Sequence, residues 1–162
     1  MPAVPNILVV DDDSVQLLVV DATLTRSGYS VFTAGNGQDA MAILRSGRRI
    51  DLVVTDLHMP DGGGADLVSF VRSTPALRDV PVIVLTGSQG EANDEVAVMN
   101  AGADDYLRKP VDPLRLIARV RAALRRTGAP EAQPASQLDA SELSAVKRVS
   151  RQIIIPPDPP DE

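Results

Sequence analysis

The feature that most constrains this chain is a fivefold alternation of short apolar runs with segments of helical periodicity. The apolar runs occupy residues 7–10, 30–34, 52–55, 80–85 and 105–108. Several are continuous and rich in Val, Ile and Leu, which is typical of strands buried on both faces of a parallel sheet. Strands of this kind alternating with helices predict an α/β fold, a doubly wound five-stranded parallel sheet with helices on both faces.

The helices are predicted from their end signals and their apolar spacing. The first begins near Asp13 or Ser14, which are good N-cap residues, and ends at Gly28. The next three are expected at residues 38–45, 66–72 and 91–100. In the last, Asp112 is the cap and Pro113 lies in the first turn. Its predicted apolar stripe consists of Leu114, Ile117, Val120 and Leu124.

A change in composition near Gly128 marks the expected end of the folded domain. The last 34 residues hold 6 of the 13 prolines. We predict a domain over residues 5–127, a linker over 128–137 and a tail over 138–162. Apolar residues recur at helical spacing between 143 and 153, which allows a short helix before a Pro-rich end. The alternatives are a disordered extension, a linker to a further domain, or a helix that docks on a partner or on a second copy.

Composition excludes several classes of function. The chain has no cysteine and a single histidine, His58, so disulfide scaffolds, thiolate metal sites and thiol nucleophiles are ruled out. A net charge of −6 disfavours direct binding of nucleic acid. No apolar run approaches the roughly 18 residues of a membrane span, and no basic residue precedes the first apolar run as in a signal peptide. We therefore expect a cytoplasmic protein.

Polar residues that suit phosphate chemistry follow four of the five predicted strands. Asp11 and Asp12 follow the first, Asp56 the third, Thr86 the fourth and Lys109 the fifth. In a parallel sheet these ends meet at one edge, where ligands bind. Crowded carboxylates repel one another, and an oxygen-only ligand set favours Mg²⁺. A lysine and a hydroxyl can hold anionic oxygens, so the whole set suits phosphoryl transfer.

Each of these residues taken alone has an ordinary structural explanation. A single Asp after a strand is usually a helix cap, and we expect that role for Asp13. Lys109 alone would usually be solvated, and Thr86 alone would be a loop or cap residue. Their joint placement at successive strand ends is what favours a functional site.

Four segments carry a resemblance to a known family. They are Ile7-Leu-Val-Val-Asp-Asp-Asp13, Val53-Val-Thr-Asp-Leu-His-Met-Pro60, Val82-Ile-Val-Leu-Thr-Gly87 and Ala101-Gly-Ala-Asp-Asp-Tyr-Leu-Arg-Lys-Pro110. Together they resemble the response-regulator receiver domain, the CheY-like fold, over about residues 5–126. The resemblance implies a flavodoxin-like (βα)5 fold with strand order 2-1-3-4-5.

The resemblance also implies a role for each site residue. Asp56 resembles the phosphoacceptor. The implied Mg²⁺ ligands are Asp11, Asp12, Asp56 and the backbone carbonyl of His58. Lys109 would pair with the acceptor and then with the phosphoryl oxygens. Thr86 and Tyr106 match the switch positions, at which the hydroxyl moves to the phosphoryl group and the aromatic ring turns inward. Tyr106 has an ordinary alternative, because a tyrosine in an edge strand often only packs.

Two positions carry open questions within the resemblance. Gly87 stands where the family often has Ala, and we expect little effect. The side chain of His58 could influence attack by water on the phosphoaspartate, or His58 could be an exposed loop residue of which only the carbonyl is used.

The function implied by the resemblance is a phosphorylation-controlled signalling switch and not a turnover enzyme, apart from self-phosphorylation and self-dephosphorylation. Its expected partners are a sensor histidine kinase or phosphotransfer protein and a downstream protein target, with a homodimer possible. One alternative is a small Mg²⁺-dependent phosphohydrolase with an aspartyl nucleophile, which Asp11-x-Asp13 superficially permits. The other is a receiver adaptor that works without phosphorylation.

Overall fold

The computed structural model describes residues 4–60, 63–87 and 92–129, in which strands and helices alternate strictly. The strands are β1 (Asn6–Val10), β2 (Ser30–Ala34), β3 (Leu52–Asp56), β4 (Val82–Thr86) and β5 (Asp105–Arg108). The helices are α1 (Ser14–Arg26), α2 (Gly37–Arg45), α3 (Gly64–Ser73), α4 (Ala92–Ala101) and α5 (Pro113–Thr127). All five predicted repeats are present in the predicted order.

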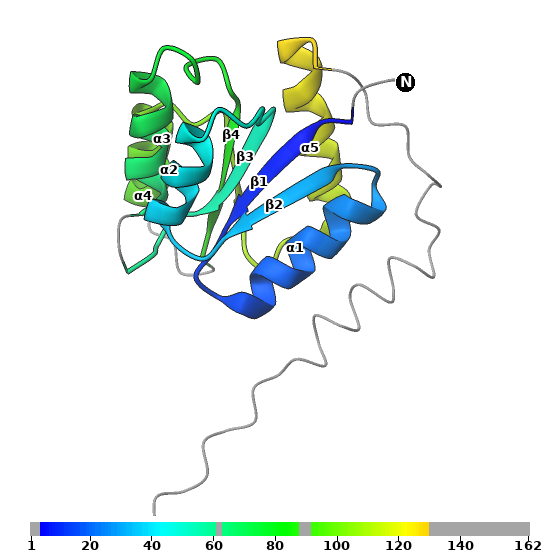
Figure 1. The fold of residues 1–162 in the computed structure, drawn as a ribbon. Coiled ribbons are helices and arrows are strands. Elements are labelled where there is room, and N and C mark those ends of the chain that lie inside the picture. Colours follow the sequence, from blue (N-terminus) through cyan, green and yellow to red (C-terminus); the bar gives the residue numbers. More distant parts are fainter. Residues whose placement is uncertain (1–3, 61–62, 88–91, 130–162) are drawn as a thin grey trace, which may run out of the picture.

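The strands form one parallel sheet in the order β2-β1-β3-β4-β5, which confirms the expected flavodoxin-like topology. Figure 1 shows the strands running in the same direction across the molecule. The register aligns Val10 with Thr55, Asp56 with Leu85, and Thr86 with Arg108. The carboxyl ends of β1, β3, β4 and β5 therefore lie along the same edge.

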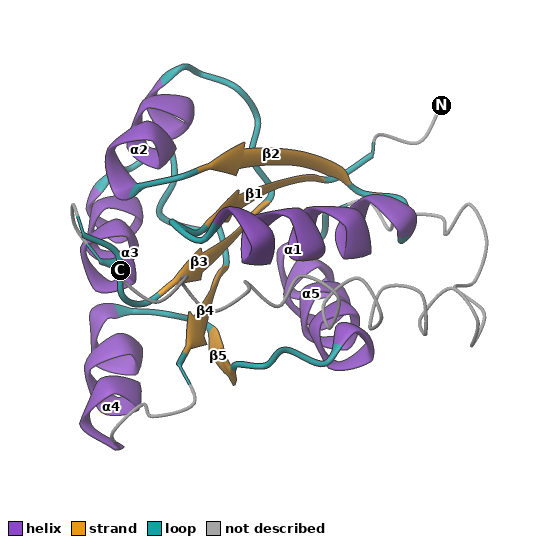
Figure 2. Ribbon diagram, turned by 90° about the horizontal axis from the view of Figure 1, so that it is seen from below, coloured by secondary structure: helices purple, strands orange, loops and turns teal. Residues whose placement is uncertain are grey.

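The helices cover both faces of the sheet. α1 and α5 lie on one face, and α2, α3 and α4 lie on the other (Figure 2). Leu8 and Val10 belong to the core beneath α2, α3 and α4, whereas Ile7 and Val9 belong to the core beneath α1 and α5. Side chains alternate between faces along a strand, so a strand with a core on each face must be apolar at every position.

The bounds of the predicted elements agree with the structure to within two residues, but one predicted core residue is wrong. Leu114 is 57% exposed, whereas Leu116 is buried. Residues 116, 120 and 124 recur at intervals of four and bury the same side of α5. Leu114 falls two residues before this series, which turns it toward solvent.

The end of α5 is also the end of the described chain. Gly128 caps the helix with a φ of 70°, a left-handed conformation that favours glycine. The predicted division into residues 5–127, 128–137 and 138–162 stays a prediction, and the predicted tail helix lies outside the described residues. Among the helices of the described part, none is long and apolar enough to cross a membrane.

Candidate functional site

Asp11 lies at the end of β1 in a buried position. It follows the strand directly, and its backbone N–H still donates to the carbonyl of Ala34 on β2. One carboxylate oxygen accepts from the N–H of Asp13 at 2.9 Å. Asp13 in turn caps α1, accepting from the N–H groups of Val15 and Gln16, as predicted. The helix cap thus separates the roles of the three consecutive aspartates: Asp13 begins the helix, Asp12 is exposed and Asp11 is buried.

Asp56 is the last residue of β3 and is 8% exposed. The first residue of α3 lies close to the strand end, where the N–H of Gly64 donates to the carbonyl of Leu57 at 2.8 Å. A Cβ on Gly64 would lie 2.6 Å from the carbonyl oxygen of Asp56. Glycine is therefore required there for close packing against the backbone that carries the acceptor candidate.

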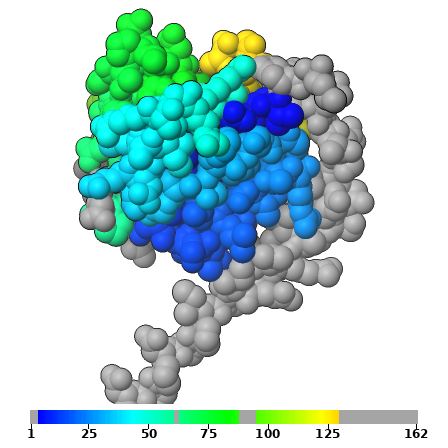
Figure 3. Space-filling view, in the orientation of Figure 1, coloured from blue at the N-terminus to red at the C-terminus, as the bar shows by residue number. Residues whose placement is uncertain are grey.

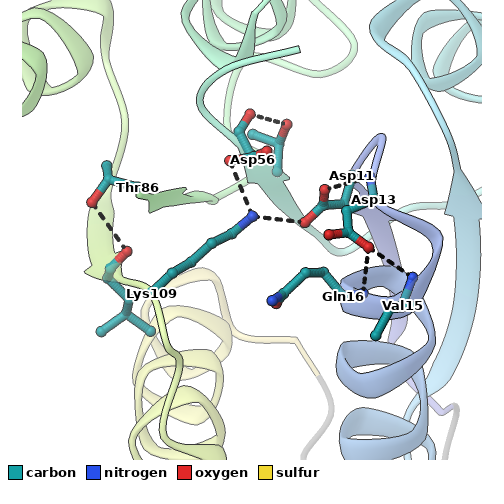
Figure 4. Close-up of polar contacts among 9 residues, drawn as sticks. Asp11, Asp13, Val15, Gln16, Asp56, Thr86 and Lys109 are labelled. Atoms are coloured by element: carbon teal, nitrogen blue, oxygen red, sulfur yellow. Dashed lines mark hydrogen bonds and ion pairs between the residues drawn. The ribbon is translucent and has the colours of Figure 1, made fainter. Parts of the chain in front are cut away.

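Lys109 follows β5 and brings a positive charge between two of the carboxylates. Its Nζ lies 3.0 Å from Asp11 Oδ2 and 3.3 Å from Asp56 Oδ1. Figure 4 shows the lysine side chain extended between the two aspartates, which come from different strands. The peptide bond between Lys109 and Pro110 is cis. The structure thus brings Asp11, Asp56 and Lys109 together as predicted.

The same geometry shifts the ionisation of both partners. Burial raises the pKa of Asp11, although the hydrogen bond from Asp13 and the nearby Lys109 act in the opposite direction. Burial by itself would lower the pKa of Lys109, but its hydrogen bond to Asp11 and the charges of Asp11 and Asp56 outweigh burial and raise it. Lys109 is therefore held in its charged form, ready to contact anionic oxygens.

A third carboxylate completes what we call the acidic pocket, defined by Asp11, Asp12, Asp56 and Lys109. One oxygen from each of the three aspartates lies within 4.8 Å of the other two. The ligand set is oxygen-only, as hard divalent cations prefer. Three carboxylates share one ammonium group, and Lys109 pairs with only two of them, Asp11 and Asp56, which leaves an excess of negative charge. These residues therefore fit a bound Mg²⁺.

The predicted switch residues lie farther along the sheet edge. Thr86 is buried at the end of β4, and its hydroxyl donates to the carbonyl of Leu107 on β5 at 3.5 Å. Figure 4 shows this hydroxyl bonded away from the Lys109 amine. Tyr106 lies on β5, where a hydrogen bond to the carboxylate of Glu95 on α4 raises the pKa of its phenol. Thr86 and Tyr106 thus contact different partners in this structure.

His58 lies two residues beyond Asp56 and is exposed. Its exposure is compatible with the simpler of the two hypotheses for this residue, a loop histidine whose side chain faces solvent. The use of its backbone carbonyl as a metal ligand stays a prediction.

Sequence reasoning missed two contributors to this region. Glu95, the partner of Tyr106, lies eleven positions away on another element, and no local pattern links the two. The close approach of Gly64 to Asp56 was also missed. The only available signal was the run of three glycines after Pro60, which indicates a tight or mobile turn equally well.

Fold and site together define an α/β domain with an acidic pocket at the carboxyl edge of its sheet, and comparison with known proteins gives the family. The family described as "Response regulator receiver domain" matches residues 7–121. The transcriptional regulatory protein PrrA of Mycobacterium leprae is 43% identical over 125 residues, which are 77% of this chain and 52% of PrrA. The phosphate regulon transcriptional regulatory protein PhoB of Pseudomonas aeruginosa is 36% identical over 76% of this chain and 53% of PhoB.

Comparison with solved structures gives the same family. A response regulator receiver protein from Pseudomonas putida matches with a TM-score of 0.69 and 32% identity, covering 75% of this chain and 99% of that one. The chemotaxis protein CheY4 of Vibrio cholerae matches with a TM-score of 0.70 and 28% identity, over 75% and 99%. This chain belongs to the response regulator receiver family and is a phosphorylation-based signalling domain. It spans about half the length of the two curated relatives.

Proposed function

We propose that Asp56 accepts a phosphoryl group from the phosphohistidine of a sensor histidine kinase or phosphotransfer protein. The observation that carries this proposal is the placement of Asp56 Oδ1 3.3 Å from Lys109 Nζ, within a group of three carboxylates. A carboxylate is a weak nucleophile toward a phosphoryl group, which is itself negatively charged. Transfer therefore needs local positive charge, which this pocket is built to hold.

The residues around Asp56 have different roles in the proposed transfer. An Asp56 carboxylate oxygen forms the new P–O bond while the P–N bond to the donor imidazole breaks, and the imidazole keeps the electron pair and takes a proton from solvent. Mg²⁺ held by Asp11, Asp12, Asp56 and the His58 carbonyl would neutralise charge on the transferring oxygens. Lys109 exchanges its contact with the acceptor carboxylate for one with a phosphoryl oxygen.

The output of the switch is proposed to be a protein–protein contact in the cytoplasm. Among the residues that the structure describes, the hydroxyl of Thr86 has one hydrogen bond, a long one of 3.5 Å to the Leu107 carbonyl, so it can be exchanged for a phosphoryl oxygen. Movement of Thr86 leaves space next to β5, into which Tyr106 can turn after leaving Glu95. Phosphorylation then biases two arrangements of α4 and β5, and a downstream protein binds one of them better.

The test is incubation of the protein with a small phosphodonor and Mg²⁺, followed by mass spectrometry of the intact chain and of its peptides. We expect a gain of one phosphoryl group at Asp56, which is absent from Asp56→Asn and absent when the metal is chelated. The matched control is Asp13→Asn, which removes a neighbouring carboxylate but leaves a residue that can cap α1. It should be phosphorylated at the wild-type rate.

The same experiment separates the alternatives. Phosphoryl label at Asp11 with continued release of phosphate would indicate the aspartyl phosphohydrolase. No mass gain with any donor would indicate the adaptor that works without phosphorylation. Asp11 is 2% exposed against 8% for Asp56, and one of its carboxylate oxygens already accepts from the N–H of Asp13, which favours a supporting role for Asp11 over attack on a substrate.

A further inference from the structure

The edge of the sheet opposite the acidic pocket carries a concentration of exposed arginines, which we call the basic pole. Its members are Arg26, Arg45, Arg48, Arg49, Arg78, Arg125 and Arg126. The topology explains this placement, because helices that cross between parallel strands end at the edge where the next strand begins. The last turns of α1, α2 and α5 each carry arginine, which complements the negative end of the helix dipole.

The negative charges near the basic pole neutralise only part of its positive charge. Asp51 is engaged by Arg49 at 3.0 Å, and Asp104 is engaged by Arg72, which is not a member of the pole. A third acidic residue near the pole, Asp79, is exposed in the loop before β4. A protein with a net charge of −6 thus has one end at which cations predominate, which is an uneven distribution that a bound polyanionic segment would balance.

The basic pole also has a hollow with an apolar side. Its lining comes from the segments that precede β3 and β4 and from the end of α5, namely Arg49, Ile50, Asp51, Ala76, Asp79, Val80, Pro81, Thr127, Gly128 and Ala129. In Figure 3 the cyan, green and yellow surfaces that carry these segments approach one another at the top of the view. The lining includes Ala129, so the chain leaves the described domain inside the hollow itself.

The sequence of the tail contains a segment with matching chemistry. Residues 153–162 read Ile-Ile-Ile-Pro-Pro-Asp-Pro-Pro-Asp-Glu, so an apolar triplet precedes three acidic residues with no lysine or arginine among them. Four prolines restrict the backbone of this segment, which lowers the conformational entropy lost on binding. The preceding part of the tail is less suitable, because it contains Lys147, Arg148 and Arg151.

We propose that residues 153–162 dock on the basic pole of the same chain. Ile153 to Ile155 contact the apolar side of the hollow, and the three carboxylates lie against arginines of the basic pole outside it, because the hollow itself is lined by one arginine, Arg49, and by Asp51 and Asp79. A random coil of 23 residues, the number between Ala129 and Ile153, has an end-to-end distance of about 26 Å, so this length is enough to return to the end of the domain that Ala129 leaves. Tethering raises the local concentration of the segment to the order of millimolar, so weak exposed ion pairs suffice for docking. The proposal does not depend on phosphorylation of Asp56.

Paramagnetic broadening tests the proposal in the full chain. The native sequence has no cysteine, so Pro160→Cys provides a single site for a nitroxide label next to the acidic residues. At low salt we expect the amides of Arg26, Arg48 and Arg78 to lose at least half of their intensity. The amides of Asp12 and Gln38, at the opposite edge, should keep theirs. Salt at 0.5 M should restore the pole signals, because it screens exposed charges.

Three variants test the charge complementarity. In the labelled chain, Asp158→Asn with Asp161→Asn and Glu162→Gln should abolish the broadening at the pole while leaving the length of the tail unchanged. Arg78→Glu with Arg126→Glu should also abolish it, and adding Asp158→Lys with Asp161→Lys to that variant should bring it back. Recovery by charge exchange would not follow from damage to the fold.

Three outcomes would overturn the proposal. The first is equal broadening over both edges of the sheet, which indicates a tail that samples the whole surface. The second is broadening at the pole that survives neutralisation of all three acidic residues. The third is observed in a mixture of two samples, spin-labelled chains without ¹⁵N and ¹⁵N-labelled chains without a spin label. Broadening at the pole in this mixture as strong as within one chain indicates docking on a second copy.

Discussion

Lys109 and Arg72 are both partly buried cations paired with aspartate, but their surroundings differ in kind. Arg72 donates to the carbonyls of Arg78, Val80 and Gly102 and to the carboxylate of Asp104. Asp104 also accepts from the N–H of Val82. We call this set the Arg72 cluster. One cation meets one anion, and the remaining donors are satisfied by backbone carbonyls.

The acidic pocket, by contrast, groups three carboxylates and has one cation, Lys109, which pairs with Asp11 and Asp56. This excess of negative charge would destabilise the domain with nothing bound, and a cation can relieve it. Both cations are partly buried, so burial does not distinguish the two sites. Charge balance does, because the Arg72 cluster is balanced and the acidic pocket is not. Variants of the two clusters should therefore respond in opposite directions.

The largest expected effect is the loss of the Arg72 cluster. Arg72→Ala removes four hydrogen bonds that join α3 to the segments around β4 and β5, and it leaves Asp104 without its cation. We expect a loss of about 2–3 kcal/mol in the free energy of unfolding, measured by urea denaturation. The control is Arg119→Ala, which breaks a more exposed pair with Asp105 and should cost about 0.5 kcal/mol. Equal losses in the two variants would contradict the importance given to the cluster.

The second effect concerns the backbone beneath the acidic pocket. Gly64→Ala places a Cβ 2.6 Å from the carbonyl oxygen of Asp56, so the loop must move. We expect a loss of about 1–3 kcal/mol in the free energy of unfolding and slower phosphorylation of Asp56. Gly35→Ala is the control, since a Cβ there meets nothing within 4 Å, and its stability should stay within about 0.5 kcal/mol of wild type. A Gly64→Ala protein as stable and as reactive as Gly35→Ala would show that the close contact is dispensable.

These two regions also show how far sequence reasoning reaches. The continuous apolar runs of β1, β3 and β4 predicted the parallel sheet, and the sheet in turn predicted that Asp11, Asp56 and Lys109 would meet at one edge. That inference needs only strand direction. The Arg72 cluster was not predicted, because it joins residues 32 positions apart through side-chain geometry. The contact between Tyr106 and Glu95 was missed for the same reason. The roles assigned to Thr86 and Tyr106 stay predictions.

A smaller effect tests the excess charge of the acidic pocket. Asp12→Asn removes one of the three carboxylates, so the metal-free protein should gain about 0.5–1 kcal/mol in stability. The variant should also be stabilised less by Mg²⁺ than wild type is, since a ligand is lost. Thermal unfolding with Mg²⁺ and with a chelator measures both changes. Asp13→Asn makes the same change in net charge outside the three-carboxylate group and keeps a capping residue on α1. Identical responses of the two variants would show that only net charge matters.

The smallest effect is a slope with pH, and its sign follows from the buried carboxyl of the acidic pocket. Burial raises the pKa of Asp11 above its usual value of 3.8, so between these two values the folded protein binds more protons than the unfolded chain. The contribution of Asp11 to stability is therefore most favourable below pH 3.8 and declines as pH rises through the raised pKa. The raised pKa of Lys109 does not add to this slope, because its stabilising effect is lost only above its usual value of 10.5.

Asp11→Asn isolates this slope. In the presence of a chelator, the free energy of unfolding of the variant minus that of wild type should increase with pH from 4 and level off once Asp11 is ionised in the folded protein. The ion pair with Lys109 forms only with the ionised carboxylate, so its contribution is already contained in this slope, where it opposes the effect of burial. Mg²⁺ should reverse the trend, because it binds the ionised carboxylate and stabilises wild type more as pH rises. A difference that stays constant or falls between pH 4 and 7 would mean that the pocket holds the Asp11 charge without penalty. The contrast with the balanced Arg72 cluster would then fail.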